Sequence, residues 1–455
     1  MKIQSVNPFT NKVIQEFDLW EDRQIELGLE RASNSYRDWR QTALHERLSR
    51  IQALAKTLER NKKRYSEIIT DEMGKTQREA ISEIEKCAST CAFLAENLED
   101  WFATEKVSAT PGSWEVVKEP MGVLVGIMPW NFPFWQVLRF AVPAIGLGNT
   151  VLLKHASNVF GCSEKIGEAF LEAGFPEGVY QHAPLSSKQI LKVIPDNRVR
   201  GVSLTGSTAA GRAVGETAGK NLKKVVLELG GSDAYVILDD ADIELAAEKC
   251  VTSRLLNAGQ SCVSAKRFIV TMSNQKKFSE LFVEKMKHKT FGDPNEEETS
   301  IGPLARLDLR DELHKQVLQA VEGGAKLALG GRMPDNPGAF YPPTVLLNVD
   351  DKNVAFREET FGPVAAIITA RNEEHAVELA NKSSYGLGSG VFSKNRERAL
   401  EIAKHRLDAG MSFVNDFVKS DVRIPFGGVK DSGVGRELGR HGVLEFANIK
   451  SVVSI

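Results

Sequence analysis

From about residue 121 onward, short apolar runs alternate with segments of helical character, and this alternation constrains the fold more than any other feature. Strands that are apolar almost throughout are typical of a parallel sheet with helices on both faces. Such runs are GVLVGIM (122–128), TVLLK (150–154), KVVLELGG (224–231) and AYVILDD (234–240). The alternation resumes after residue 262 with KRFIVTM (266–272) and AAIITA (365–370). The sequence therefore predicts an α/β fold with two α/β units.

The remainder of the chain predicts additional elements. A chain of 455 residues is longer than one hydrophobic core normally supports, so we expect two or more domains. The first hundred residues carry apolar side chains at helical spacing, as in Leu48, Ile51, Leu54 and Leu58. The pair Pro111-Gly112 between two β-prone runs predicts a hairpin. The closing segment LEFANIKSVVSI (444–455) predicts a terminal strand able to pair across a subunit boundary.

Charge and cysteine content narrow the classes of function. A formal net charge of -2 provides no long-range field suited to nucleic acid or an anionic membrane, so we expect a small-molecule partner. The five cysteines are too few for a disulfide framework, and their odd number favours a reducing, cytoplasmic location. Cys87 and Cys91 share a predicted helix face, but no second Cys or His pair accompanies them, so we expect no metal site. The N-terminal residues lack the apolar core of a signal peptide.

One cysteine lies in an unusual setting, the stretch NAGQSCVSAKR (257–267). Free cysteines are commonly buried for packing alone, which is the simplest interpretation of Cys262. The polar residues before it, with Gly259 among them, instead suggest backbone that approaches a ligand. From these residues alone Cys262 is either a core residue or a nucleophile.

Three other stretches carry residues suited to chemistry. Gly206 and Gly211 follow a predicted strand and open a helix, where backbone N–H groups can hold a phosphate; Arg212-Ala213 replaces the residues that a Walker loop needs. Glu228 ends an apolar strand, so it is either a partly desolvated general base or a carboxylate that turns outward. Asn131, between two prolines, is either an oxyanion donor or a simple turn residue.

Taken together, these stretches resemble the aldehyde dehydrogenase superfamily, and the matching motifs run along nearly the whole chain. They are NPFTNKVI (7–14), MPWNFP (128–133), LLK ending at Lys154, TGSTAAG (205–211), LELGG (227–231), NAGQSC (257–262), GDP (292–294), IGPL (301–304), EETFGPV (358–364), YGL (385–387) and PFGGVKDSGVGRELG (425–439). The resemblance implies three parts. These are a Rossmann-like dinucleotide-binding domain (1–103 and 121–228), a second α/β catalytic domain (229–420) and a small β oligomerisation flap (104–120 and 430–455). It also implies a homodimer or homotetramer.

The resemblance assigns chemical roles to three residues. Cys262 attacks the aldehyde carbon to give a thiohemiacetal, whose oxyanion is held by Asn131 and the backbone N–H of Cys262. Hydride then leaves for the nicotinamide of NAD or NADP. Glu228 activates the water that hydrolyses the resulting thioester.

The resemblance also assigns cofactor-binding residues. Lys154 corresponds to the residue that binds the adenosine ribose, Ser207 and Trp130 line the pyrophosphate region beside Gly206, and Glu359 with Phe361 holds the nicotinamide ribose and ring. NAD-preferring members commonly carry Glu three residues after the lysine, where this chain has Ser157. Without that carboxylate a 2′-phosphate is not repelled, so we expect NADP to be preferred and NAD to be the alternative.

Arg139 suggests the substrate. Family members acting on succinate semialdehyde carry an arginine there that binds the distal carboxylate, and the surrounding helix is otherwise apolar. Their second arginine is replaced here by Leu256, and we expect Ser420 and Arg423 to supply the missing donors. The alternative is that Arg139 forms an internal ion pair. Other hypotheses are a dehydrogenase of uncharged aldehydes, a cofactor-independent cysteine hydrolase and a binding protein that has lost catalysis.

Overall fold

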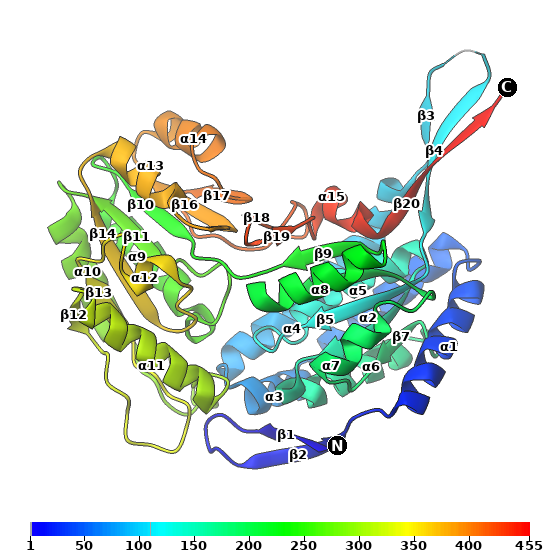
Figure 1. The fold of residues 1–455 in the computed structure, drawn as a ribbon, viewed down its shortest axis with the longest axis horizontal. Helices are drawn as coiled ribbons and strands as arrows, with labels where there is room; N and C mark the ends of the chain where they lie inside the picture. Colours follow the sequence, from blue (N-terminus) through cyan, green and yellow to red (C-terminus); the bar gives the residue numbers. More distant parts are fainter. Residues whose placement is uncertain (1, 110) are drawn as a thin grey trace.

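The computed structural model describes residues 2–109 and 111–455, which form two α/β lobes and a projecting β flap (Figure 1). The first lobe is built on a six-stranded sheet of order β19-β9-β8-β5-β6-β7. Its strands are β5 (Val123–Met128), β6 (Thr150–His155), β7 (Tyr180–His182), β8 (Val199–Thr205), β9 (Lys224–Glu228) and β19 (Gly433–Val434). All neighbours are parallel except β19, which runs antiparallel to β9. The parallel sheet predicted from the apolar runs is confirmed.

Helices surround this sheet, and one of them, α5 (Trp135–Leu147), is completely buried. They are α1 (Asp22–Trp39), α2 (Leu44–Arg60), α3 (Lys62–Met73), α4 (Gln77–Phe102), α5 (Trp135–Leu147), α6 (Phe160–Glu172), α7 (Ser187–Val193) and α8 (Thr208–Lys220). Helix α5 contacts β5 and β6 on one side and α2 and α4 on the other, so every one of its residues is buried. Arg139, a charged residue on this mainly apolar helix, is therefore buried.

The second lobe has a seven-stranded sheet of order β12-β13-β14-β11-β10-β16-β17. Its strands are β10 (Ala234–Ile237), β11 (Arg267–Thr271), β12 (Lys326–Leu329), β13 (Thr344–Leu347), β14 (Val364–Ala370), β16 (Gly388–Phe392) and β17 (Met411–Val414). Only the edge strand β12 is antiparallel to its neighbour. Its helices are α9 (Ile243–Leu255), α10 (Gln275–Lys287), α11 (Leu307–Glu322), α12 (Val354–Arg357), α13 (Glu373–Asn381) and α14 (Arg396–His405). The second α/β unit is confirmed.

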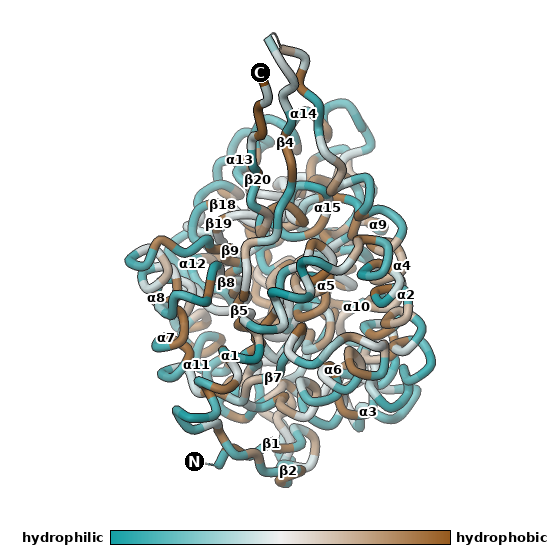
Figure 2. Tube along the Cα trace, turned by 90° about the vertical axis from the view of Figure 1, so that its right-hand side faces the viewer, coloured by the Kyte–Doolittle hydropathy of each residue, from teal (hydrophilic) through white to brown (hydrophobic). Residues whose placement is uncertain are grey.

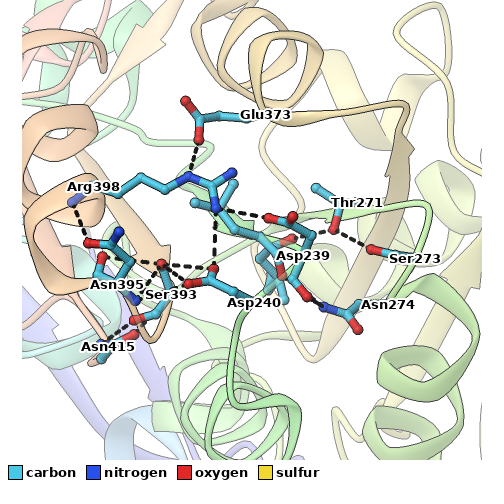
Figure 3. Close-up of polar contacts among 12 residues, drawn as sticks. Asp239, Asp240, Thr271, Ser273, Asn274, Glu373, Ser393, Asn395, Arg398 and Asn415 are labelled. Carbon is cyan, nitrogen blue, oxygen red and sulfur yellow. Dashed lines mark hydrogen bonds and ion pairs between the residues drawn. The ribbon is translucent and has the colours of Figure 1, made fainter.

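Polar side chains form a network of hydrogen bonds and ion pairs at the carboxyl end of this second sheet (Figure 3). Arg398 of α14 pairs with Asp239 at 3.0 Å, with Asp240 at 3.5 Å and with Glu373 of α13. Ser393, just after β16, donates to Asp240 at 2.8 Å. Because these groups satisfy one another, they fasten α13 and α14 to the sheet. The loop that carries Cys262 lies at the opposite end, directly before β11.

The flap is a three-stranded antiparallel sheet of β20 (Ala447–Ser454), β4 (Ser113–Pro120) and β3 (Glu105–Val107), which extends away from both lobes (Figure 1). The predicted hairpin and terminal strand are confirmed. Figure 2 shows apolar stretches along these projecting strands, and the side chains of Trp114, Ile449 and Val453 are exposed. One predicted boundary is wrong: the segment from residue 430 does not belong wholly to the flap. β19 joins the first sheet, and α15 (Gly439–Val443) contacts α5.

Two structural observations bear on membranes and metals. Within residues 2–109 and 111–455, no helix combines the length and apolar character needed to cross a bilayer. The same residues contain no group of three or more His, Cys, Asp or Glu side chains able to hold a metal ion. All five cysteines are free, and Cys262 alone among them is partly exposed.

Candidate active site

Most of the predicted site residues lie at the carboxyl ends of the strands of the first lobe. Asn131 follows β5, Lys154 lies near the end of β6, Gly206 follows β8, and Glu228 ends β9. Ligands of open α/β sheets bind at this edge, outside the carboxyl ends of the strands. The second lobe contributes the loop that carries Cys262, so the site lies between the two sheets.

The backbone before Cys262 makes an unusual turn. Asn257, Ala258 and Gly259 all have positive φ, at 55°, 54° and 74°. Left-handed backbone costs about 1–2 kcal/mol for a residue with a Cβ, so this turn persists only because its surroundings hold it. A Cβ at Gly259 would overlap the backbone of Gly362. Glycine thus allows the nucleophile loop to pack against the segment that carries Glu359 and Phe361.

Two fully buried cations hold this loop in place. Arg254 donates to the carbonyl oxygen of Gly259 at 2.5 Å and to that of Ala265 at 3.1 Å. The Nζ of Lys266 donates to the carbonyl oxygens of Ser261 at 2.9 Å and Cys262 at 2.6 Å. The carbonyl groups on both sides of the nucleophile are therefore fixed by charge-assisted hydrogen bonds.

Asn131 lies against the same loop. Its Nδ2 donates to the carbonyl oxygen of Gln260 at 2.9 Å, and its Oδ1 accepts from Gln136 Nε2 at 3.0 Å. An amide nitrogen has two N–H groups, and the bond to Gln260 uses one of them. The side chain is thus held in one orientation with a second N–H available as a donor.

Cys262 opens onto a cavity of about 340 Å³. The cavity is also lined by Lys86, Arg139, Leu256 and Ser420. Burial raises the pKa of the Cys262 thiol to about 12, while the positive charges of Lys266 and then Arg139 act in the opposite direction. In the absence of ligands the sulfur is therefore mainly a thiol at neutral pH.

Glu228 is 2% exposed, and neither carboxylate oxygen has a hydrogen-bond partner among the described residues. Burial raises its pKa well above the usual range, and the negative charge of Glu437 adds to this effect, while Arg139 opposes it. Three residues after Glu228, Gly231 packs so closely that a Cβ there would lie 2.8 Å from the carbonyl oxygen of Cys262. The carboxyl group therefore lies in surroundings that favour its protonated form.

The residues predicted to hold the adenosine half of a dinucleotide fit that group. Burial lowers the pKa of Lys154 to about 8, and no carboxylate in the described ranges pairs with it. Ser207 caps α8 by accepting from Ala210 N at 3.3 Å, and the Gly206 N–H is bonded to the carbonyl oxygen of Glu228 at 2.9 Å. A cation without a carboxylate partner suits a ribose or phosphate, and so does the N-terminus of a helix. Ser157, partly exposed, begins a short 3-10 turn three residues after Lys154.

Phe361, predicted for the nicotinamide half, lies next to Trp130, predicted for the pyrophosphate region. Trp130 and Phe361 meet edge to face with ring centroids 5.8 Å apart. Glu359 Oε1 accepts from the backbone N–H of Gly231 at 3.1 Å and lies 3.2 Å from Lys266 Nζ. Lys266 thereby connects the predicted ribose-binding carboxylate with the backbone of the nucleophile.

The predicted substrate residues are only partly brought together. Arg139 and Ser420 both line the cavity. Arg139 also forms an ion pair with Glu437, donates to Thr205 Oγ1 at 3.3 Å and lies over the Phe426 ring at 4.7 Å. The premise that Arg139 has no partner within the protein is wrong, and the internal ion pair that was the alternative is present.

Arg423 is not brought to the cavity. Its Nε donates to Asp421 Oδ1 at 2.8 Å, and 70% of its side-chain surface is exposed. A short local ion pair two residues away satisfies the guanidinium, so this loop arginine turns toward solvent.

Sequence reasoning missed Lys86, Arg254 and Glu437. Lys86 and Arg254 lie on α4 and α9 among several other charged residues, and the sequence gives no sign of which ones face inward. Glu437 lies within the motif PFGGVKDSGVGRELG, but its direction depends on how β19 pairs with β9. A buried charge is detectable only once its neighbours are placed.

Comparison with known proteins identifies the family. The model of the aldehyde dehydrogenase family matches residues 1–452. A succinate semialdehyde dehydrogenase [NAD(P)+] of Escherichia coli strain K12 is 44% identical over 448 residues, covering 98% of this chain and 97% of that protein. A probable succinate-semialdehyde dehydrogenase [NADP(+)] of Synechocystis is 41% identical, with 99% of each chain covered. The crystal structure of succinic semialdehyde dehydrogenase from Streptococcus pyogenes with NADP+ matches with a TM-score of 0.97 at 39% identity, covering 99% of each chain.

The chain belongs to the aldehyde dehydrogenase family, and its two lobes and flap have the aldehyde dehydrogenase fold. It is an NAD(P)-dependent aldehyde dehydrogenase that resembles succinate-semialdehyde dehydrogenases in sequence.

The raised pKa of Cys262 predicts how the cofactor-free protein reacts with an alkylating agent. Since only the thiolate reacts and the pKa is about 12, the thiolate fraction rises about tenfold for each pH unit below that value. We expect the rate of iodoacetamide labelling at Cys262, followed by mass spectrometry, to rise about tenfold from pH 7 to 8 and again from pH 8 to 9. Cys262→Ser measures labelling at the four buried cysteines. A rate that levels off by pH 8 would contradict the prediction.

Proposed function

We propose that this chain oxidises succinate semialdehyde to succinate and prefers NADP to NAD. The observation that carries the proposal is the cavity at Cys262, because a guanidinium, that of Arg139, lines it. A cation in the aldehyde cavity favours a substrate with a negative charge at the end remote from the aldehyde. The names of the relatives from Escherichia coli and Synechocystis support the same substrate.

Cys262 acts as the nucleophile. In its thiolate form, after the thiol proton has passed to water, its sulfur bonds to the aldehyde carbon as the C=O π bond breaks, which gives a thiohemiacetal anion with the negative charge on the former carbonyl oxygen. The free N–H of Asn131 Nδ2 and the backbone N–H of Cys262 donate to that oxygen. Removing one such donor costs about 2.7–4 kcal/mol in related chemistry. The rigid bonds of Asn131 to Gln260 and Gln136 keep this donor in position.

Glu228 completes the reaction. A bound nicotinamide cofactor would supply the acceptor for the hydride that the thiohemiacetal must lose to become a thioester. The carboxylate form of Glu228 then takes a proton from water, the water oxygen attacks the thioester carbon, and the carbon–sulfur bond breaks to release the acid and Cys262. Since the pKa of Glu228 is raised, the ionised fraction of this base increases as the pH rises.

Arg139 binds the remote carboxylate of the substrate together with Ser420. A guanidinium has five N–H donors, and the contacts with Glu437 and Thr205 use only part of them. Ser420 lines the same cavity and can donate through its hydroxyl. Arg423, which is exposed and paired with Asp421, is not part of this proposal.

NADP preference follows from the absence of a carboxylate at Ser157. A glutamate there would accept from the ribose 2′-hydroxyl and repel a 2′-phosphate. Here Lys154 has no carboxylate partner within the described ranges, and the residue three positions later is a neutral serine. An additional negative charge on the ribose would be attracted to Lys154 without opposition from Ser157.

We further propose that the enzyme is a cytoplasmic homodimer or homotetramer. Among the residues that the structure describes, β20 pairs with β4 on one edge only, and Val452 and Val453 of that strand are exposed. Exposed apolar edges of this kind are usually covered by another chain. Five free cysteines are compatible with a reducing compartment.

Arg139→Ala tests the substrate. We compare kcat/KM for succinate semialdehyde with that for butanal, which has the same four-carbon chain without the carboxylate. Loss of a charge-assisted hydrogen bond predicts that the ratio of the two values falls roughly 10- to 100-fold. Both individual values also decrease, because Glu437 loses its ion pair. An unchanged ratio would show that Arg139 does not bind the carboxylate.

Ser157→Glu tests the cofactor preference, with Ser157→Gln as the neutral control of similar size. A carboxylate beside a 2′-phosphate is a like-charge contact that costs several kcal/mol. We expect kcat/KM for NADP to fall at least tenfold in Ser157→Glu, while the value for NAD is maintained or rises. Steady-state assays with both cofactors measure this, and an equal change for both cofactors in Ser157→Glu would refute the proposed role.

A further inference from the structure

Lys86 is one of the cations that line the aldehyde cavity together with Arg139. It lies on α4, on the side of the helix that faces the cavity. Its Nζ donates to the carbonyl oxygen of Ser420 at 3.0 Å and to Ser420 Oγ at 2.6 Å. It also lies 4.1 Å from the centroid of the Trp135 ring, where a cation is attracted to the ring face. These contacts hold the ammonium at the cavity wall.

All these partners of Lys86 are neutral. No carboxylate among residues 2–109 and 111–455 forms an ion pair with it. The carboxylates of Glu83 and Asp421, whose negative charges act on Lys86, have other partners. Glu83 accepts from Phe134 N, Trp135 N and Lys75, and Asp421 pairs with Arg423. Lys86 is therefore a partly buried positive charge without a counterion, which is costly unless a ligand supplies one.

Lys86 and Arg139 differ in whether a carboxylate of the protein balances their charge. The Arg139 guanidinium already faces the carboxylate of Glu437. Burial lowers the pKa of Lys86 to about 8, and the positive charge of Arg139 adds to that effect, whereas Cys87, Glu83 and Asp421 oppose it. The charge that gains most from an incoming anion is thus the ammonium of Lys86.

We propose that Lys86 binds the carboxylate of the substrate at the end remote from the aldehyde, in the place of the second arginine that Leu256 replaces. An ammonium has three N–H donors, and Ser420 accepts two of them, so the third is available. Ser420 Oγ accepts from Lys86 and keeps its own hydrogen to donate to the same carboxylate. Lys86, Ser420 and Arg139 then form one anion-binding end of the cavity.

This inference rests on the proposed succinate semialdehyde activity, and one set of assays separates the two. We compare kcat/KM for succinate semialdehyde and butanal in the wild type, Lys86→Gln, Lys86→Arg and Lys56→Gln. Lys56 is an exposed lysine of α2 and controls for the loss of a charge. In Lys86→Gln we expect the ratio to fall roughly 10- to 100-fold, mainly through a higher KM for succinate semialdehyde. Lys86→Arg keeps the charge and should retain part of the preference.

The outcomes are distinguishable. A wild type that shows no preference for succinate semialdehyde overturns the proposed function and this inference together. A wild type that prefers succinate semialdehyde, with a ratio that is unchanged in Lys86→Gln, overturns the role of Lys86 alone.

A second measurement uses the unaltered enzyme and so does not depend on the folding of a variant. Acetic anhydride acetylates unprotonated lysines, and mass spectrometry reports the extent at each one. We expect succinate to slow acetylation of Lys86 at least several-fold and to leave Lys56 unaffected, because a bound carboxylate stabilises the protonated ammonium and covers it. Equal acetylation of Lys86 with and without succinate would overturn the inference.

Discussion

The site depends on the hydrogen bonds that two buried cations make to the backbone of a strained turn. Residues 257–259 all adopt left-handed backbone. Arg254 and Lys266 donate to four carbonyl oxygens of this loop, those of Gly259, Ser261, Cys262 and Ala265. This arrangement places Cys262 at the cavity and packs Gly259 against the segment that carries Glu359 and Phe361. Because Lys266 also lies 3.2 Å from Glu359, the conformation of the nucleophile is linked to the carboxylate expected to hold the cofactor ribose.

A buried ion pair, Arg139 with Glu437, acts electrostatically on the reacting groups. Arg139 pairs with Glu437, and its positive charge lowers the pKa values of both Cys262 and Glu228, which burial raises. Without ligands, Cys262 and Glu228 are both mainly protonated, so the thiol is a poor nucleophile and the carboxyl group a poor base until a ligand changes their surroundings. The same arginine lines the substrate cavity, so a bound carboxylate would act on the field that both groups experience.

Local sequence patterns were sufficient to predict elements and several site positions. The apolar runs GVLVGIM and TVLLK predicted strands of a parallel sheet, and these are the neighbouring parallel strands β5 and β6. The resemblance placed Cys262, Asn131 and Glu228 on segments that the fold does bring together. What the sequence could not provide is the direction of side chains that meet across distant elements. The ion pair of Arg139 with Glu437 depends on β19 pairing with β9, and the approach of Lys86 to Ser420 depends on α4 packing against the loop after β17.

The central claim is that Cys262 forms an acyl intermediate that Glu228 resolves with water. The most direct test is a rapid-mixing measurement of NADPH formation by Glu228→Gln with aldehyde and NADP in excess. The account predicts a burst of about one NADPH per active site, followed by turnover roughly 10²- to 10⁴-fold slower than in the wild type, because reduction precedes the step that needs the base. Steady turnover at the wild-type rate would contradict the account, and so would the absence of a burst from a folded Glu228→Gln enzyme.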